Sequence, residues 1–146
     1  MLETYTTSLI GLWLVLTTIT LQAVIATGAH RRQSKMVPGI VDPALSHDSF
    51  VFRSDRTFRN SLENIVPFFG LSVLAMLAGF SAEQLAIVVW VYALARLFHM
   101  ILYYRIATEK NPSPRSYFYM VGLLATFYLI GDCLLYTSDA ADDVRG

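Results

Sequence analysis

Residues 52–80, FRSDRTFRNSLENIVPFFGLSVLAMLAGF, join a charged segment directly to a long apolar one. Three arginines, Arg53, Arg56 and Arg59, are followed by Glu63, and beyond it the chain is mostly apolar up to Phe80. An apolar run of about 20 residues is long enough to cross a bilayer as a helix. The stretch therefore predicts a transmembrane helix whose entrance carries an unusual amount of positive charge.

The composition of the whole chain is that of a membrane protein. Of its 146 residues, 55% are hydrophobic and 15% are charged, whereas soluble domains carry about a quarter charged residues. The net charge is zero, so the chain has no overall positive field to attract nucleic acid. The one cysteine, Cys133, excludes an intrachain disulfide, and His30, His47 and His99 are too scattered to predict a metal site. No role can be read for His47.

Four apolar stretches are long enough to span a membrane, at roughly 5–29, 61–80, 84–104 and 116–135. The first is not a signal peptide, because its start carries no lysine or arginine and its apolar run is too long. We predict an all-α integral membrane four-helix bundle, with one transmembrane domain over 1–135.

The chain ends in an abrupt polar tail, residues 136–146. The sequence LLYTSDAADDVRG at the end resembles the translated read-through of a sequencing adapter, as seen in some metagenomic reading frames. We therefore interpret the tail as non-native and the source as bacterial.

Basic residues gather in two of the three predicted connections. Arginines and lysines occur in the segment 30–60 and again in 105–115, whereas the turn near 81–83 has none. Positively charged loops stay in the cytoplasm. We expect a multi-pass protein, of a bacterial inner membrane, with both termini on the non-cytoplasmic side.

The charged residues of the second helix share one face. Arg56, Asn60 and Glu63 stand at i, i+4 and i+7, and Arg53 and Arg59 flank them. An unpaired charge in lipid is costly, so Glu63 must face protein or a water-filled cavity.

Two other helices bring polar residues to the same side of the membrane. Arg96 lies within the third span, and His99 and Tyr103 follow it on one helical face. Arg115 and Ser116 begin the fourth span. The combined set is rich in cations, whereas a purely structural network should balance its buried charges. The excess suggests an anionic ligand that carries carboxylates and an amino group.

Plainer interpretations are open for several of these residues. Arg53 and Arg59 are also placed to contact lipid headgroups. Glu63 and Arg96 are also placed to form an interhelical salt bridge. His99 is favoured as a hydrogen-bonding residue between helices. Tyr103 is also placed to be an ordinary membrane-interface tyrosine.

Three motifs, taken together, resemble the MAPEG family, the membrane-associated proteins in eicosanoid and glutathione metabolism. They are RxxRxxRNxxENxxPF from Arg53 to Phe68, ARLFHMILYY from Ala95, and NPSPRS from Asn111. The resemblance implies a four-helix protomer that assembles as a homotrimer in the bilayer. It also implies glutathione, as co-substrate, at the interface between subunits.

The resemblance also assigns residues to the site. Positions where the family places glutathione contacts are occupied here by Arg56, Asn60, Glu63, Arg96, Tyr103 and Arg115. Arg59 and Ser116 match the prostaglandin E synthase-like branch, and Arg53 is a further cofactor-binding candidate. Phe58 is a departure, because several members have a histidine there.

This assignment predicts a glutathione-dependent transferase or peroxidase. A neighbouring cation stabilises a thiolate, and we assign that role to Arg115, with Ser116 or Tyr103 donating a hydrogen bond. The thiolate would attack a lipophilic electrophile or reduce a lipid hydroperoxide that enters from the bilayer. The alternative is a non-catalytic binding or regulatory protein of the same fold. A transporter ranks lower, because the polar groups, apart from Arg96, cluster at one side.

Overall fold

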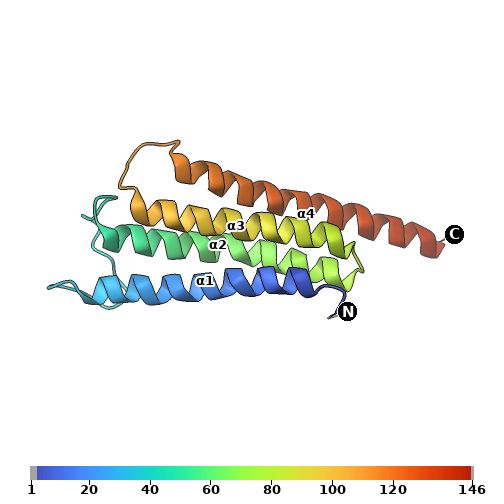
Figure 1. Cartoon of the computed structure of the whole chain (residues 1–146), viewed down its shortest axis with the longest axis horizontal. Coiled ribbons are helices and arrows are strands. Elements are labelled where there is room, and N and C mark those ends of the chain that lie inside the picture. Colours follow the sequence, from blue (N-terminus) through green and yellow to red (C-terminus); the bar gives the residue numbers. More distant parts are fainter. Residues whose placement is uncertain (1–2, 146) are drawn as a thin grey trace.

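The computed structural model describes residues 3–145, and the side chains of residues 3–135. Four antiparallel helices account for most of the chain: α1 (Thr6–Arg31), α2 (Phe50–Leu77), α3 (Ala82–Arg105) and α4 (Pro114–Arg145) (Figure 1). All four are long and apolar enough to cross a membrane. The predicted all-α membrane bundle is therefore confirmed, and the charged segment at 52–63 is helical, as expected.

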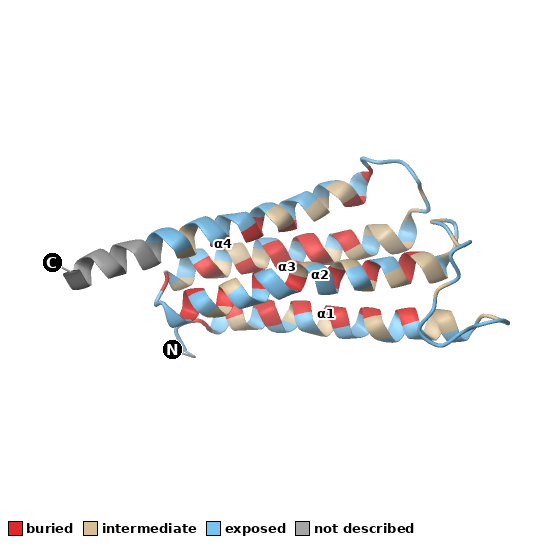
Figure 2. Ribbon diagram, turned by 180° about the vertical axis from the view of Figure 1, so that it is seen from behind, coloured by how far each residue is buried: buried red, intermediate tan, exposed pale blue. Residues whose placement is uncertain are grey.

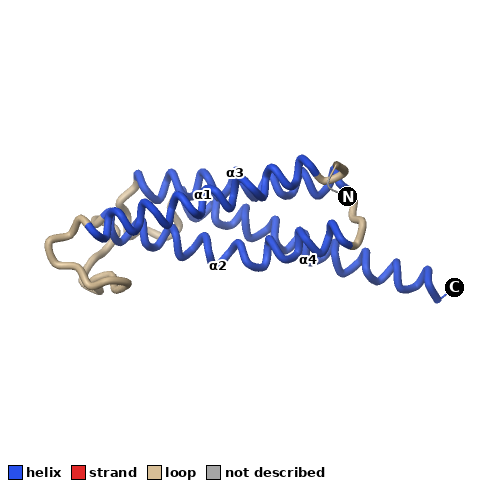
Figure 3. Tube along the Cα trace, turned by 90° about the horizontal axis from the view of Figure 1, so that it is seen from below, coloured by secondary structure: helices blue, strands red, loops and turns tan. Residues whose placement is uncertain are grey.

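The helices run up and down, so that the two ends of the bundle differ. The connections 32–49 and 106–113 lie at one end, and both termini lie at the other end together with the short turn 78–81 (Figure 1). In the described part of the chain, α2 and α3 each contact three helices, whereas α1 and α4 do not contact each other (Figure 3). The two outer helices are thus held together only through the central pair.

The core occupies the middle of the bundle and is built from aromatic and aliphatic side chains. Phe68 of α2 stacks on Tyr92 of α3, with ring centroids 3.7 Å apart, and Leu85, Val89 and Leu129 are fully buried around them. Many large apolar side chains are exposed on the outside of the bundle. Figure 2 shows the exposed residues of the helices in pale blue. Exposed apolar side chains suit a bundle surrounded by lipid, because their contact with lipid costs no free energy.

Local chemistry explains where the central helices begin and end. The Ser81 hydroxyl oxygen accepts the backbone N–H of Gln84 and so caps the start of α3. Gly79 has a positive φ angle of 77°, which the short turn between α2 and α3 requires. Gly11 lets α1 approach α3, because a Cβ atom at that position would lie 2.6 Å from Cγ1 of Val89.

The fourth helix is longer than the sequence predicted. It continues beyond the expected end at 135 and runs to Arg145, because residues 136–145 contain neither glycine nor proline to interrupt it. The candidate span within it ends at Leu135. The side chains of the polar tail, 136–146, lie outside those that the structure describes.

Candidate functional site

An open groove of about 480 Å³ lies at the loop end of the bundle, between α2, α3 and α4. Asn60 of α2 and Tyr103 of α3 face it together with Arg115 and Ser116 at the start of α4. Four residues that the sequence placed in one site, on three different helices, are therefore brought together.

Arg96 does not line the groove itself: it borders a small pocket between α1, α2 and α3, and it reaches the groove through its hydrogen bond to Asn60. It is the most deeply buried charge of the predicted set. Its side chain is 4% exposed. One guanidinium nitrogen, Nη2, donates to Oδ1 of Asn60 at 2.7 Å and to Oγ of Ser61 at 3.1 Å. The other two nitrogens, Nε and Nη1, are buried without a hydrogen-bond partner. A buried guanidinium with open donors and no carboxylate against it favours an anion nearby.

The salt bridge between Glu63 and Arg96, one of the interpretations left open by the sequence, is not formed within the protomer. Glu63 is exposed on the outward face of α2, as is Arg56. Among the described side chains, Asp55 and Arg59 form an ion pair, and the contact between His47 and Glu109 is an ion pair only when the His47 ring is protonated. Pro67 has no N–H to donate to the backbone carbonyl of Glu63. That carbonyl is therefore a further polar group on this face.

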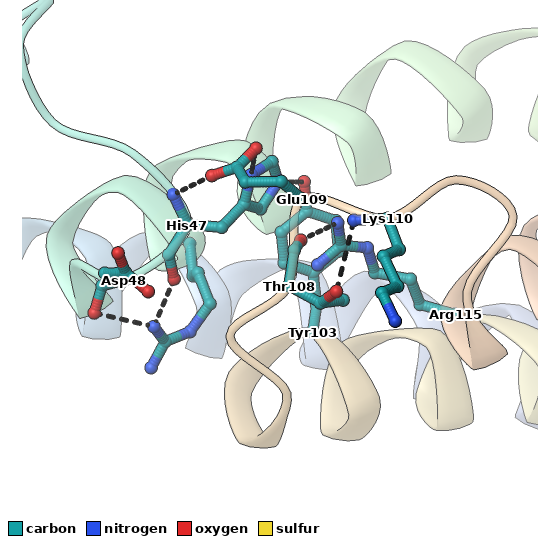
Figure 4. Close-up of polar contacts among 8 residues, drawn as sticks. His47, Asp48, Tyr103, Thr108, Glu109, Lys110 and Arg115 are labelled. Atoms are coloured by element: carbon teal, nitrogen blue, oxygen red, sulfur yellow. Dashed lines mark hydrogen bonds and ion pairs between the residues drawn. The ribbon is translucent and has the colours of Figure 1, made fainter.

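Arg115 is held at the mouth of the groove by two contacts. Its Nη2 donates to the carbonyl of Thr108 at 2.9 Å, and its guanidinium carbon lies 4.2 Å from the centre of the Tyr103 ring (Figure 4). The remaining terminal nitrogen, Nη1, is buried and has no partner. Arg115 therefore presents a fixed charge with an unused donor, and the cation–π contact orients it.

Ser116 lies beside Arg115 in the first turn of α4. Its hydroxyl donates to Oδ1 of Asn111 at 3.2 Å and accepts the backbone N–H of Ser113 at 3.1 Å. Pro114, at the first helical position, needs no N–H there and so favours this helix start. The Ser116 hydroxyl reaches the groove but is already engaged within the chain.

Two arginines of the predicted set lie away from the groove. Arg53 is buried under the end of the 32–49 loop, where its guanidinium donates to the carbonyls of His47, Asp48 and Tyr104. Arg59 pairs with Asp55 at 2.8 Å. Neither arrangement leaves the guanidinium free within the protomer to reach the same ligand as Arg115.

Arg59 and Phe58 line a separate cavity of about 270 Å³ between α1, the 36–41 segment and α2. Phe58 also packs against the hydrophobic core. It is on the side of α2 opposite Asn60, so the histidine that it replaces would not reach the groove of its own protomer.

Several residues that line the groove were not among the predicted site residues. His47 and Glu109 come from the two loops, and His99 and Tyr119 come from α3 and α4. Loop residues give no periodic signal, so His47 and Glu109 could not be found. His99 shares a face with Arg96 and Tyr103, which was the available signal. Its Nδ1 is buried with no partner, so the expected interhelical hydrogen bond is not seen at that atom.

The fold and site together define an integral membrane four-helix bundle with a polar groove at one end. The model of the MAPEG family matches residues 7–135, nearly the whole apolar part of the chain. The chain therefore belongs to the MAPEG family, and it is a multi-pass membrane protein of a glutathione-related kind. No curated protein and no solved structure matches it.

Proposed function

We propose that the protein is a glutathione-dependent transferase or peroxidase that acts on lipophilic electrophiles or hydroperoxides. The observation that carries this proposal is the pair of buried guanidinium groups, Arg96 and Arg115, whose open donors have no carboxylate against them. Glutathione offers two carboxylates to such donors, an amino group and a thiol. Membership of the MAPEG family supports glutathione over other anions.

Arg115 is the group that we propose to hold the thiolate. A free thiol titrates near pH ~8.5, and an adjacent cation lowers that value. Arg115 suits this role because the Thr108 carbonyl and the Tyr103 ring fix its position before a ligand arrives. Tyr103 or Ser116 would add a hydrogen bond to the thiolate, and Asn60 lies across the groove from them.

Two outcomes are open to the thiolate. With an electrophile, its sulfur forms a bond to carbon as the leaving group departs with the bonding electrons. With a hydroperoxide, the sulfur takes the terminal oxygen and an alcohol leaves, and a second glutathione then converts the sulfenic acid to the disulfide and water. Either lipophilic substrate would approach from the bilayer that surrounds the helices.

The proposal includes a homotrimer with the ligand between subunits. Arg56 and Glu63 are exposed on a membrane-spanning helix, and charges at such positions are expected to face protein or water. A neighbouring subunit would cover them and could bring Glu63 to the glutathione amino group. Arg53 and Arg59 are the members of the predicted binding set for which the protomer gives least support.

A non-catalytic binding or regulatory protein is the second candidate function. One observation favours it: the hydroxyls of Tyr103 and Ser116 both have partners within the chain. A groove that binds an anion through its arginines, but has no free hydroxyl to offer the sulfur, could hold glutathione without activating it.

Substitution of Arg115 separates the two candidates. Arg115→Ala should lower turnover with conjugation or peroxide substrates at least tenfold, because the thiolate loses its cation. Arg105→Ala is the matched control, since Arg105 is an exposed arginine at the end of α3 and does not line the groove. Unchanged turnover in Arg115→Ala would overturn the assigned role. Glutathione binding by the unaltered protein without turnover of any substrate would support the regulatory alternative.

A further inference from the structure

The two loops at the site end of the bundle meet in one hydrogen-bonded group, the His47 cluster, made of His47, Glu109 and Tyr103 (Figure 4). The backbone N–H of His47 donates to Oε1 of Glu109 at 2.9 Å, and the ring Nδ1 lies 2.7 Å from Oε2. The other ring nitrogen, Nε2, lies 3.1 Å from the Tyr103 hydroxyl. The cluster therefore connects a loop carboxylate to a tyrosine that lines the groove.

The carboxylate determines which ring nitrogen carries the proton. The two hydrogen bonds from His47 lower the pKa of Glu109, so its carboxylate stays ionised at neutral pH. An ionised carboxylate only accepts hydrogen bonds, so Nδ1 must be the donor. In the neutral ring, Nε2 then has only a lone pair, and the Tyr103 hydroxyl must donate to it.

This arrangement directs the Tyr103 proton to His47, so the proton is not available to a ligand in the groove. The oxygen lone pairs of Tyr103 remain available to a ligand, so in the resting protein Tyr103 can accept a proton from a thiol but cannot donate one to it. Arg115, which lies over the same ring, carries no acceptor and cannot take a proton. Among the side chains that the structure describes, the acceptor for the Tyr103 proton is therefore His47.

We propose that His47, oriented by Glu109, is a positioning residue that draws the thiol proton of bound glutathione through Tyr103. This inference rests on the proposed glutathione-dependent function. The S–H bond breaks and its proton goes to the Tyr103 oxygen, while the original Tyr103 proton passes to Nε2 of His47. The products are a thiolate, an imidazolium ion and a tyrosine whose new O–H donates to the sulfur. No electrons are exchanged, and the total charge does not change.

The transfer resolves a conflict between two observations. Tyr103 is expected to donate to the thiolate, yet its hydroxyl donates to His47 in the resting arrangement. The double transfer converts Tyr103 from an acceptor of the thiol into a donor to the thiolate in the same step. The imidazolium then keeps its charge-assisted contact with Glu109.

His47 makes more contacts than are needed to join the two loops. The bond from the His47 backbone to Glu109 already joins the two loops. The ring adds a second contact that points inward, and its plane is fixed by Phe52, edge-on at 5.0 Å, and by Tyr103 at 5.8 Å. The His47 side chain is only 18% exposed, whereas that of Glu109 is 67% exposed.

Other charged or titratable groups border the same groove as the His47 ring. Lys110 follows Glu109 in its loop, and the His99 ring of α3 lies 5.4 Å from that of Tyr103. From α2, Arg53 donates to the His47 carbonyl, and from α4, Arg115 lies on the far side of the Tyr103 ring. Asp48 follows in the chain, and its carbonyl accepts from Arg53. The carboxylate that contacts the ring is Glu109, which makes it the residue to alter.

The test is a pH titration of the ultraviolet thiolate absorbance of glutathione bound to the protein and its variants. In Glu109→Gln, the amide oxygen can accept the His47 backbone N–H while its NH₂ faces Nδ1. That forces the ring proton onto Nε2 and closes the route through Tyr103. The thiolate midpoint should rise by about one pH unit, a tenfold loss of thiolate below it. His47→Gln should give a similar rise, and it carries the test if Glu109→Gln does not fold.

A double-mutant cycle separates this role from a structural one. In a Tyr103→Phe background the route is already cut, so Glu109→Gln should cause no further rise in the midpoint. His30→Gln is the matched control, because His30 contacts the carbonyl of Val37 in the same loop and does not reach Tyr103. The control should leave the midpoint unchanged.

The outcomes also distinguish this inference from the proposed function. If the unaltered protein binds no glutathione, both are overturned. If the unaltered protein forms a thiolate that Arg115→Ala abolishes, but Glu109→Gln does not shift the thiolate midpoint, the His47 cluster only holds the two loops together. Additive shifts from Tyr103→Phe and Glu109→Gln would likewise contradict a route through Tyr103.

Discussion

Arg53 and Arg115 stand near the starts of two helices at the same end of the bundle, and both are 9% exposed. Both terminal nitrogens of Arg53 donate to backbone carbonyls of its own chain, whereas only one of those of Arg115 does. The first region fastens the 32–49 loop to α2 and α3. The second leaves a donor open beside a groove. Each arginine also keeps one buried nitrogen without a partner, Nε in Arg53 and Nη1 in Arg115. What separates the two is that Arg53 holds three carbonyls of its own chain and lies away from the groove, whereas Arg115 holds one and lines the groove.

The comparison predicts opposite consequences for two alanine variants. Arg53→Ala should lower the free energy of unfolding by about 2–3 kcal/mol, because the carbonyls of His47 and Asp48 lose a charged donor. Arg115→Ala should change stability by about 1 kcal/mol or less, because it removes one carbonyl contact. Thermal unfolding in detergent checks both, with the exposed Arg105→Ala as control. Equal losses for the two variants would break the comparison.

Arg96 tests the same distinction between a structural and a binding arginine at a more deeply buried position. Arg96→Met removes a buried charge while keeping much of the side-chain volume, and such replacements often leave stability unchanged or higher. We expect glutathione affinity to fall about tenfold, which corresponds to the loss of one good contact. The melting temperature should stay close to that of the unaltered protein. Equilibrium binding and thermal unfolding measure the two quantities. A large loss of stability with intact binding would make Arg96 a structural residue like Arg53.

The smallest expected effect concerns the loops and pH. The pKa of Glu109 is lowered in the folded protein by the hydrogen bonds from His47, so its contribution is fully present above the ordinary glutamate value, about 4.3. That contribution is lost as the pH falls through the lowered pKa. Proteolysis of the 32–49 loop should accelerate in that acidic range. Glu109→Gln should remove the pH dependence, and a Glu109→Gln loop that still responded to acid would assign the effect to another group.

The fold was largely predictable because its signals are local. Four apolar stretches predict the spans, and helical spacing alone places Arg56, Asn60 and Glu63 on one face. Arg96, Tyr103 and Arg115 were predictable for the same reason, since charges and tyrosines within or beside apolar helices stand out against their surroundings.

The rest of the site depends on contacts that no local pattern encodes. His47 and Glu109 are separated by more than sixty residues and meet only because two irregular loops fold over one end of the bundle. The different positions of Arg53 and Arg59 were also hidden, because spacing along α2 does not show which neighbour each side chain meets. Helical periodicity gives a direction for a side chain, but the partner is decided by packing.

The most direct test of the central claim is glutathione binding to the purified, detergent-solubilised protein, with thiolate absorbance followed in the ultraviolet at neutral pH. The open donors of Arg96 and Arg115 predict saturable binding with a thiolate signal that Arg115→Ala removes. Binding without a thiolate signal would contradict the catalytic role of Arg115 and favour the regulatory alternative. No binding by a folded protein would contradict the glutathione assignment and leave the open donors to lipid or another anion.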